Sequence, residues 1–365
     1  MPDLFFYYIF NMKILVIALS GIGDALMFTP AIELLKKHSP NSEIDALVMI
    51  KGSEEIYSLN PNLNNIIYFD FVNEGLVNSL KFVKRLRNTY DISINVYPSN
   101  RKEYNIINFL IGAKKRAGVK YLRRNILNLG FLNNVLVQED DSVHNVKTNI
   151  KLCKAITEKE FNEEPALSYQ LIGEDLQFAK EFLQAHFIKE QDLIVGFHAG
   201  CSTLKNHIKR RWEPEKFAEL AKRLIEGHSA KILLFGGPDE KELKTGIFKL
   251  INSENVFIIE TESLNQSSAI MKRCSVFVTN DSSQMHIASA LQLKVVALIG
   301  PTNRHYIHPW KTEHKIVSLN LDCSPCFFYS PRALICSRND IKFKCIKELN
   351  VKMVYNSVAE FIKGA

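Results

Sequence analysis

Small polar and acidic residues follow a buried, strand-like segment near the start of the 365-residue chain. The apolar run 13–19 ends in Ser20-Gly21-Ile22-Gly23-Asp24, after which a helical pattern begins. A carboxylate at such a turn can act as a general base when a hydroxyl comes within hydrogen-bond reach. Asp24 can equally cap the helix by accepting from the free N–H groups of its first turn. From these residues alone both roles stay open.

The same turn departs from a dinucleotide-binding fingerprint in two ways. Leu26 stands where G-x-G-x-x-G has its third glycine. No acidic residue ends the second strand-like segment, 43–49, because Asp45 lies inside it. The pattern therefore argues against an NAD site.

A second polar turn, 279–286, joins another buried strand to a helix. Asp281, Ser282 and Ser283 are small or acidic, so backbone N–H groups at the helix N-terminus can hold an anion. This pattern predicts a diphosphate site, with His286 on the first turns of the helix. Taken alone, His286 is more typical of a structural histidine than of a ligand.

Two further turns follow strand-like segments. Residues 198–202 (HAGCS) precede four cations, which are Lys205, Lys209, Arg210 and Arg211. Such cations can hold phosphates and stabilise a departing diphosphate, although a basic surface loop has the same composition. In the turn 236–240 (GGPDE), Asp239 or Glu240 can accept ribose hydroxyls, or can simply place a favourable charge in a first helical turn.

Strand and helix patterns alternate along the whole chain, which predicts parallel sheets in an α/β protein. We expect two Rossmann-like domains that face an interdomain cleft, with ligands at the carboxyl ends of strands. The predicted boundaries are 12–175 and 190–348, and the Glu- and Gln-rich stretch 162–192 holds the linker. A C-terminal helix, 349–365, is expected to pack back on the N-terminal domain.

Charge is concentrated rather than spread. The chain carries 46 Lys and Arg against 39 Asp and Glu, a net charge of +7. Residues 81–124 hold 12 cations against Asp91 and Glu103. This excess predicts an anionic partner, and a solvated helix face is the alternative interpretation.

The remaining composition is that of a water-soluble globular protein. No run approaches the roughly 20 apolar residues that span a bilayer. Residues 1–11 are apolar, but Asp3 interrupts them and no cleavage site follows, so we expect an alternative start with Met12 as the working first residue. A cytoplasmic protein is expected.

Taken together, these segments resemble glycosyltransferase family 9, the ADP-heptose:lipopolysaccharide heptosyltransferases. The matching pieces run in the family's order from about residue 13 to 350. They are KILVIALSGIGDALMFTPAIELLKK, GAKKRAGV, HNVKTNIKL, HAG…RRWEPEKFAELAKRL, LLFGGPDE, VTNDSSQMHIASALQLKVVALIGPTN and CSPCFF.

The resemblance implies a GT-B fold and an inverting transfer from ADP-heptose to the lipopolysaccharide inner core, Kdo-lipid A or its heptosylated form. Asp24 would deprotonate the acceptor hydroxyl, and no cofactor would be required for the chemistry. The donor would be held by Ser202, Lys209, Arg210, Glu240, Asp281, Ser282, Ser283 and His286. An anionic lipid-linked acceptor would contact Gly21, Gly23, Lys114, Lys115, Arg116 and Lys120, with Arg123 and Arg124 beside them.

The chain also departs from the family pattern. Ser282-Ser283 stands where the family usually has Thr-Gly, and Arg210 stands where it usually has Lys. Because Arg and Lys are not equivalent phosphate partners, these changes bear on the identity of the donor sugar. Peripheral contact with the cytoplasmic face of the inner membrane would follow from a lipid-linked acceptor.

Four cysteines lie within 23 residues near the C-terminus: Cys323, Cys326, Cys336 and Cys345. Family members often carry such a tail, and its spacing suits a structural tetrahedral site for Zn or Fe. Reduced thiols packed in a loop, or a disulfide, are the alternatives.

Several other functions fit parts of the pattern. The same fold can use another nucleotide sugar, glycosylate a protein, or epimerise a sugar nucleotide. A non-catalytic GT-B scaffold that binds nucleotide sugars or anions is a candidate of another class. Nucleic-acid binding is not expected, because the chain holds no recognised nucleic-acid motif.

Overall fold

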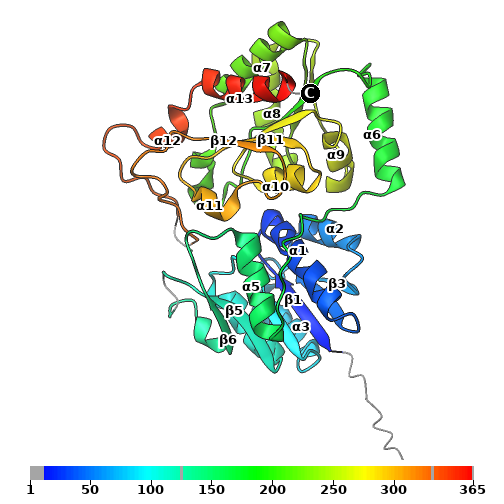
Figure 1. The fold of residues 1–365 in the computed structure, drawn as a ribbon, viewed down its shortest axis with the longest axis vertical. Coiled ribbons are helices and arrows are strands. Elements are labelled where there is room, and N and C mark those ends of the chain that lie inside the picture. Colours follow the sequence, from blue (N-terminus) through cyan, green and yellow to red (C-terminus); the bar gives the residue numbers. More distant parts are fainter. Residues whose placement is uncertain (1–11, 124–125, 330–332, 364–365) are drawn as a thin grey trace, which may run out of the picture. The chain divides into compact units, whose positions relative to one another are not determined.

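The computed structural model describes residues 12–123, 126–329 and 333–363. These residues divide into two compact units (Figure 1). Unit 1 runs to Asp140 and includes Asn145–Pro165, and unit 2 comprises Asp141–His144 and the chain from Ala166 onward. The first predicted domain boundary, 175, thus lies ten residues beyond the observed one. The apolar segment 1–11 and Arg124 lie outside the described residues.

Unit 1 is built on a six-stranded parallel sheet with the order β3-β2-β1-β4-β5-β6. Its strands are β1 (Lys13–Ala18), β2 (Glu43–Val48), β3 (Asn65–Tyr68), β4 (Ile92–Asn95), β5 (Lys115–Lys120) and β6 (Val135–Gln138). Its helices are α1 (Ile22–His38), α2 (Lys51–Ser58), α3 (Gly75–Arg85), α4 (Lys102–Ile111), η1 (Gly130–Leu132) and α5 (Asn145–Thr157). Because the strands are parallel, their carboxyl ends share one edge of the sheet.

Unit 2 repeats this plan with the strand order β12-β11-β10-β7-β8-β9. Its strands are β7 (Ile194–His198), β8 (Lys231–Phe235), β9 (Val256–Ile258), β10 (Val276–Asn280), β11 (Lys294–Leu298) and β12 (His314–Val317). Its helices are α6 (Gly173–Ala185), η2 (Leu204–Arg210), α7 (Pro214–His228), η3 (Pro238–Glu240), α8 (Lys241–Ile251), α9 (Leu264–Met271), α10 (Ser283–Ala290), α11 (Arg304–Ile307), α12 (Lys344–Lys347) and α13 (Val351–Lys363).

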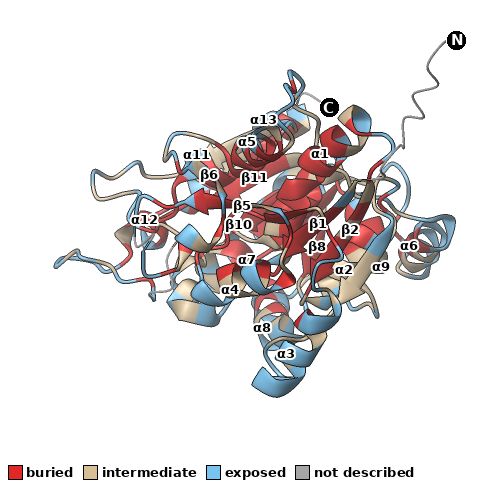
Figure 2. Cartoon of the chain, turned by 90° about the horizontal axis from the view of Figure 1, so that it is seen from below, coloured by how far each residue is buried: buried red, intermediate tan, exposed pale blue. Residues whose placement is uncertain are grey.

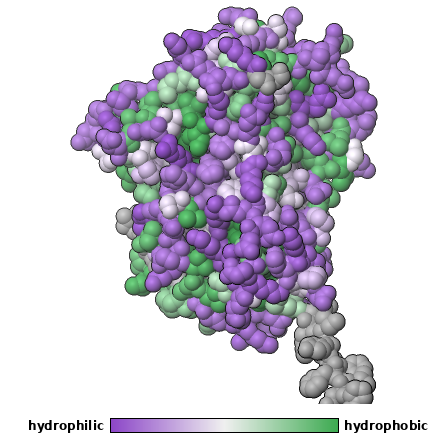
Figure 3. Space-filling view, in the orientation of Figure 1, coloured by the Kyte–Doolittle hydropathy of each residue, from purple (hydrophilic) through white to green (hydrophobic). Residues whose placement is uncertain are grey.

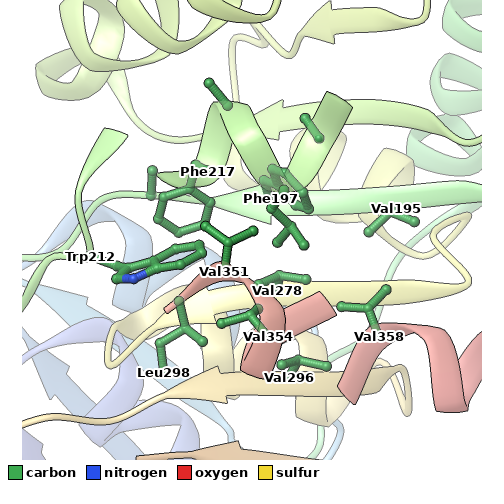
Figure 4. Close-up of a cluster of buried hydrophobic side chains, with 14 of the residues drawn as sticks. Val195, Phe197, Trp212, Phe217, Val278, Val296, Leu298, Val351, Val354 and Val358 are labelled. Carbon is green, nitrogen blue, oxygen red and sulfur yellow. The ribbon is translucent and has the colours of Figure 1, made fainter. Parts of the chain in front are cut away.

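Each sheet is covered by the apolar faces of its helices. In Figure 2 the strands are largely buried, and the helices keep exposed outer faces. In unit 2, Trp212 and Phe217 pack with Val278 and Leu298 of the sheet (Figure 4). Helix α7 buries an apolar stripe made of Phe217, Leu220, Ala221 and Leu224. The helix runs through Gly227 and ends at His228.

The C-terminal helix does not follow the sequence expectation. Val351, Val354, Val358 and Phe361 of α13 belong to the core of unit 2, where α13 is drawn beside the sheet strands in Figure 4. The indole N–H of Trp212 donates to Leu349 O at 2.8 Å, just before this helix. An amphipathic pattern predicts a buried face, but it does not say which unit buries it.

Helix α1 tolerates a proline in its interior. Pro30 cannot donate to the carbonyl of Leu26, four residues earlier. The Thr29 hydroxyl donates to that carbonyl instead, at 2.8 Å. The helix therefore starts at Ile22 and runs on past Pro30. Among the described residues, no helix is both long and apolar enough to cross a membrane.

Candidate active site

Asp24 lies at the carboxyl edge of the unit 1 sheet, as the third residue of α1. Its Oδ2 accepts from the backbone N–H of Gly21 at 3.0 Å, so the capping interpretation is confirmed. Gly21 directly precedes α1, and Gly23 is buried in its first turn. Capping fixes the Asp24 carboxylate at the edge where parallel α/β sheets bind ligands. A general base needs the same fixed placement, so the two roles are compatible.

Aromatic residues from other elements gather at this edge. The Tyr104 hydroxyl of α4 donates to Leu19 O at 2.8 Å. Burial raises the pKa of Tyr104, and the charge of the Asp24 carboxylate adds to this rise, whereas the charge of Arg101 acts against it. Burial also raises the pKa of Tyr121, which follows β5, and the charge of Asp24 adds to that rise. The Asp24 carboxylate thus lies close enough to Tyr104 and Tyr121 for its charge to act on both.

The predicted acceptor-binding cations do not all lie at this edge. Lys114, Lys115 and Arg116 are at the amino end of β5, since Lys115 pairs in register with Ile92 at the start of β4. Lys115 forms an ion pair with Glu158 at 2.6 Å, and Lys114 lies 3.7 Å from Asp91.

Arg116 donates to the carbonyls of Ala113 and Leu132. Lys120, by contrast, ends β5 at the carboxyl edge and is exposed. The structure therefore separates three of the four predicted cations from Asp24. The sequence showed that these basic residues are close together along the chain, but not that Lys114, Lys115 and Arg116 lie at the amino end of a strand.

The corresponding edge of unit 2 holds a hydrogen-bonded histidine. His198 ends β7, and its Nδ1 lies 2.9 Å from Ser282 Oγ. Its Nε2 lies 2.9 Å from Glu240 Oε2. The His198 side chain is only 4% exposed. This buried imidazole therefore connects the turn before α10 to the turn before α8.

Two arginines form ion pairs beside this histidine. Arg210 Nη1 donates to Asp281 Oδ2 at 2.5 Å, and that oxygen also accepts from the Thr302 hydroxyl at 2.6 Å. Arg211 Nη2 donates to Cys201 O at 2.7 Å and lies 3.4 Å from Glu240 Oε1. Both arginine side chains are at most 15% exposed, so these pairs are far less screened by water than surface pairs.

Asn280 fixes the backbone that carries this cluster. Its amide donates to Ala199 O at 2.7 Å, and its Oδ1 accepts from Trp212 N at 3.0 Å. One buried side chain thus joins the end of β10 to the turn after β7 and to the residue after the two arginines. Asn280 and Thr302 were not predicted from the sequence, although Asn280 directly precedes Asp281.

Glycines allow Glu240 to come close to the backbone. A Cβ placed on Gly200 would lie 1.6 Å from Glu240 Oε1, and one on Gly236 would lie 2.7 Å from Glu240 Oε2. Gly236 also has φ +154°, a conformation that side chains disfavour. The glycines of these two turns therefore make room for the Glu240 carboxylate.

Several buried nitrogens of this site have no hydrogen-bond partner in the described structure: Arg210 Nε, Arg211 Nε, His207 Nε2 and His286 Nδ1. Arg210 Nη2 lies 3.2 Å from His207 Nδ1. Since guanidinium groups only donate, His207 Nδ1 accepts and its Nε2 carries the proton. Three unpartnered N–H donors therefore belong to residues 207–211, which suits an anion.

The ionisation of these groups follows from burial. Burial lowers the pKa of His207 to about 4, and the neighbouring Arg210 cation contributes. Burial also lowers the pKa of His286 to about 4, so both histidines are neutral at pH 7. For Glu240, burial favours the protonated form, but its hydrogen bond with His198 and the charge of Arg211 outweigh that effect and lower its pKa.

The other predicted donor residues lie around this cluster. Ser282 directly precedes α10, and Ser283 is its first residue. Ser202 is exposed, and its hydroxyl accepts from Leu204 N at 3.3 Å. Lys209 is exposed, so Arg210 rather than Lys209 is the cation that pairs with Asp281.

The four C-terminal cysteines are free thiols. Burial raises the pKa of Cys345 to about 11, and Cys326, Cys336 and Cys323 contribute, so the four lie near one another. Cys336 Sγ accepts from Phe343 N at 3.3 Å. In the part of the chain that the structure describes, no group of three or more His, Cys, Asp or Glu is arranged to hold a metal ion. The predicted Zn or Fe site is therefore unsupported.

Comparison with known proteins agrees with this architecture. The profile of glycosyltransferase family 9 (heptosyltransferase) matches residues 79–334. Lipooligosaccharide heptosyltransferase 2 of Campylobacter jejuni is 24% identical over 325 residues, which cover 86% of this chain and 90% of that protein.

Two solved structures share the fold. A family 9 glycosyltransferase from Veillonella parvula has a TM-score of 0.75 and 20% identity, with 97% of this chain and 98% of that chain covered. The Escherichia coli ADP-heptose lipopolysaccharide heptosyltransferase II has a TM-score of 0.75 and 21% identity, with 97% and 99% covered. The chain belongs to glycosyltransferase family 9, with the GT-B fold, and is a glycosyltransferase.

Proposed function

We propose that this chain transfers a heptose from ADP-heptose to a sugar hydroxyl of the lipopolysaccharide inner core, on Kdo-lipid A or its heptosylated form. The observation that carries the proposal is the set of unpartnered, buried N–H donors on His207, Arg210 and Arg211 beside Asp281. The names of its relatives, which are lipooligosaccharide and lipopolysaccharide heptosyltransferases, support this substrate class.

The donor would bind at the carboxyl edge of the unit 2 sheet. Its diphosphate would accept from Arg210, Arg211 and the N–H groups at the start of α10, where the helix dipole favours negative charge. Glu240, held ionised by His198 and Arg211, would accept the ribose hydroxyls. The turn that begins at Ser202 and the exposed Lys209 would contact the outer face of the donor.

The reaction would be a single displacement with inversion. The acceptor hydroxyl oxygen forms a bond to the anomeric carbon, while the bond from that carbon to the diphosphate oxygen breaks. The hydroxyl proton goes to Asp24, and ADP leaves with the bonding electron pair. Charge on the leaving diphosphate is stabilised by Arg210 and the α10 N-terminus, where it develops in the transition state.

The acceptor would bind unit 1 near Asp24. Arg101, whose charge acts on Tyr104, and Lys120, at the carboxyl end of β5, would supply cations to the acceptor, and Gly21 and Gly23 would keep the turn narrow. An acceptor that is anionic and lipid-linked places the enzyme at a membrane surface, and we propose the cytoplasmic face of the inner membrane.

The donor assignment can be tested by binding. We expect ADP-heptose to bind the wild type, and Arg210→Gln to raise its Kd at least tenfold because a charge-assisted hydrogen bond is lost. Lys222→Gln is the matched control, since this exposed cation lies on α7 and outside the proposed donor site, and its Kd should change less than twofold. Titration calorimetry gives both values, and circular dichroism checks the fold.

The Ser282-Ser283 pair, where the family usually has Thr-Gly, favours a second candidate in which the donor carries another sugar. Tighter binding of a different ADP- or UDP-sugar than of ADP-heptose would support that candidate and contradict the heptose assignment. Failure to bind any nucleotide sugar would contradict both.

A further inference from the structure

Helix α3 and the residues beside it expose both apolar and basic side chains. Val72, just before it, is 74% exposed, and Leu76, Val77 and Leu80 are 75%, 65% and 49% exposed. The four cations that follow, Lys81, Lys84, Arg85 and Arg87, are all exposed. Exposed leucines and valines beside a run of cations are unusual on a surface that faces only water.

The C-terminal half of α3 holds the helix in place. Val83 is 3% exposed and belongs to the core of unit 1. Phe82 stacks on Phe69 with ring centroids 4.1 Å apart and meets Phe71 edge-on at 5.8 Å. Leu86 packs against the same core. Leu76 lies about two turns before Val83 and so on the same side of the helix, but it is exposed. The N-terminal half of α3 therefore extends beyond the core that buries its C-terminal half.

The position of α3 in the sheet connects it to the proposed acceptor edge. It follows the carboxyl end of the parallel strand β3, so its N-terminal turns start at the edge that holds Asp24. A second exposed apolar group follows the carboxyl end of β5, where Leu122, Ile126 and Phe131 are 52%, 79% and 63% exposed. Figure 3 shows hydrophobic side chains among hydrophilic ones on the surface of unit 1.

We propose that α3 binds an anionic lipid bilayer, with Val72, Leu76, Val77 and Leu80 inserted at the interface and the cations Lys81, Lys84, Arg85 and Arg87 on the headgroups. Amphipathic helices bind membranes through this combination of buried apolar area and attraction to anionic lipids. Charge complementarity favours a lipid surface over a second copy of this chain, because two copies would bring like charges together. The inference rests on the proposed function only in that a lipid-linked acceptor gives the surface its use.

The test is flotation of the full chain with vesicles of phosphatidylethanolamine, with and without phosphatidylglycerol. We expect binding to the anionic vesicles that weakens as salt rises. The double variant Leu76→Asp/Val77→Asp should bind at least tenfold more weakly, since it removes apolar contact. Acids in a first helical turn favour the helix, so the variant keeps its fold.

A second variant tests the contribution of the cations to vesicle binding, and a third is a control. The variant Lys81→Gln/Lys84→Gln/Arg85→Gln should lose about a hundredfold in affinity for anionic vesicles. Phe187→Asp is the control, because Phe187 is an 84% exposed apolar residue of unit 2, and its vesicle binding should match the wild type. Equal binding of wild type and Leu76→Asp/Val77→Asp would overturn the proposal, and so would a wild type that binds neither vesicle.

Other occupants would give different results. A dimer in light scattering that Leu76→Asp/Val77→Asp dissociates, without vesicle binding, would overturn the proposal in favour of a second copy. Transfer to a water-soluble, acyl-free acceptor separates the two proposals, because all variants should keep wild-type kcat and KM there. If the wild type transfers no heptose but binds anionic vesicles, and the variants bind them more weakly, the proposed function fails and the proposed membrane surface stands.

Discussion

Gly200 and Glu240 show how closely single residues are fitted in unit 2. The Glu240 carboxylate occupies the space that any side chain on Gly200 would need. The same carboxylate receives the hydrogen bond of His198 and faces Arg211. Loss of this one glycine should therefore disturb the group proposed to hold the ribose.

We predict that Gly200→Ala raises the Kd for ADP-heptose at least tenfold, because the added methyl group displaces Glu240. Gly237→Ala is the matched control, since a Cβ on Gly237 meets no atom within 4 Å. It should bind the donor as the wild type does. Titration calorimetry of both variants checks this, and equal affinities would show that Glu240 does not contact the donor.

Sequence patterns identified acids and cations more readily than their partners. Asp24, Glu240 and Asp281 were each predicted from a turn after a strand, and the structure places each at a carboxyl edge. Lys114 and Lys115 were misplaced because a basic cluster does not record which end of a strand it occupies. Asn280 and Thr302 were missed since their role depends on contacts over long sequence distances.

Helix α10 carries a buried histidine that should make stability depend on pH. Burial lowers the pKa of His286 to about 4 in the folded chain, whereas an unfolded histidine titrates near 6.5. Between these values the unfolded chain binds a proton that the folded chain does not. The contribution of His286 to stability is therefore full above pH 6.5 and falls as the pH drops toward 4, by roughly 3 kcal/mol at most.

Urea unfolding of the wild type and His286→Gln at pH 7.5 and pH 4.5 measures this effect. The difference in free energy of unfolding between the two pH values should be smaller in the variant, because glutamine does not titrate. An equal difference in both proteins would mean that the pKa of His286 is the same in the folded and the unfolded chain.

At the scale of elements, local sequence patterns predicted where a helix begins better than they predicted which part of the fold it packs against. The polar turn before α10 was predicted correctly from the sequence, since β10 ends at Asn280 and α10 begins at Ser283. The passage of α1 through Pro30 depends on the Thr29 hydroxyl, which propensity does not include. The packing of α13 on unit 2 depends on tertiary contacts such as those of Val354 and Val358.

At the scale of the whole molecule, alternating strand and helix patterns were enough to predict two parallel α/β units. Buried parallel strands are nearly continuous apolar runs, as in Ile14–Ile17 and Val295–Leu298, so they stand out in the sequence. The unit boundary was less clear, because residues 141–144 join unit 2 while 145–165 return to unit 1. The interdomain cleft stays a prediction.

The measurement that tests the central claim most directly is transfer of heptose from ADP-heptose to an acyl-free, Kdo-bearing acceptor by the wild type and Asp24→Asn. Asparagine can still accept the capping hydrogen bond of Gly21, so the variant loses the base and keeps the helix start. We predict transfer by the wild type and a kcat lower by about a hundredfold or more in the variant, with an unchanged Kd for ADP-heptose. Equal kcat values in the two proteins would contradict the role of Asp24, and no transfer by a wild type that binds ADP-heptose would contradict the proposed acceptor.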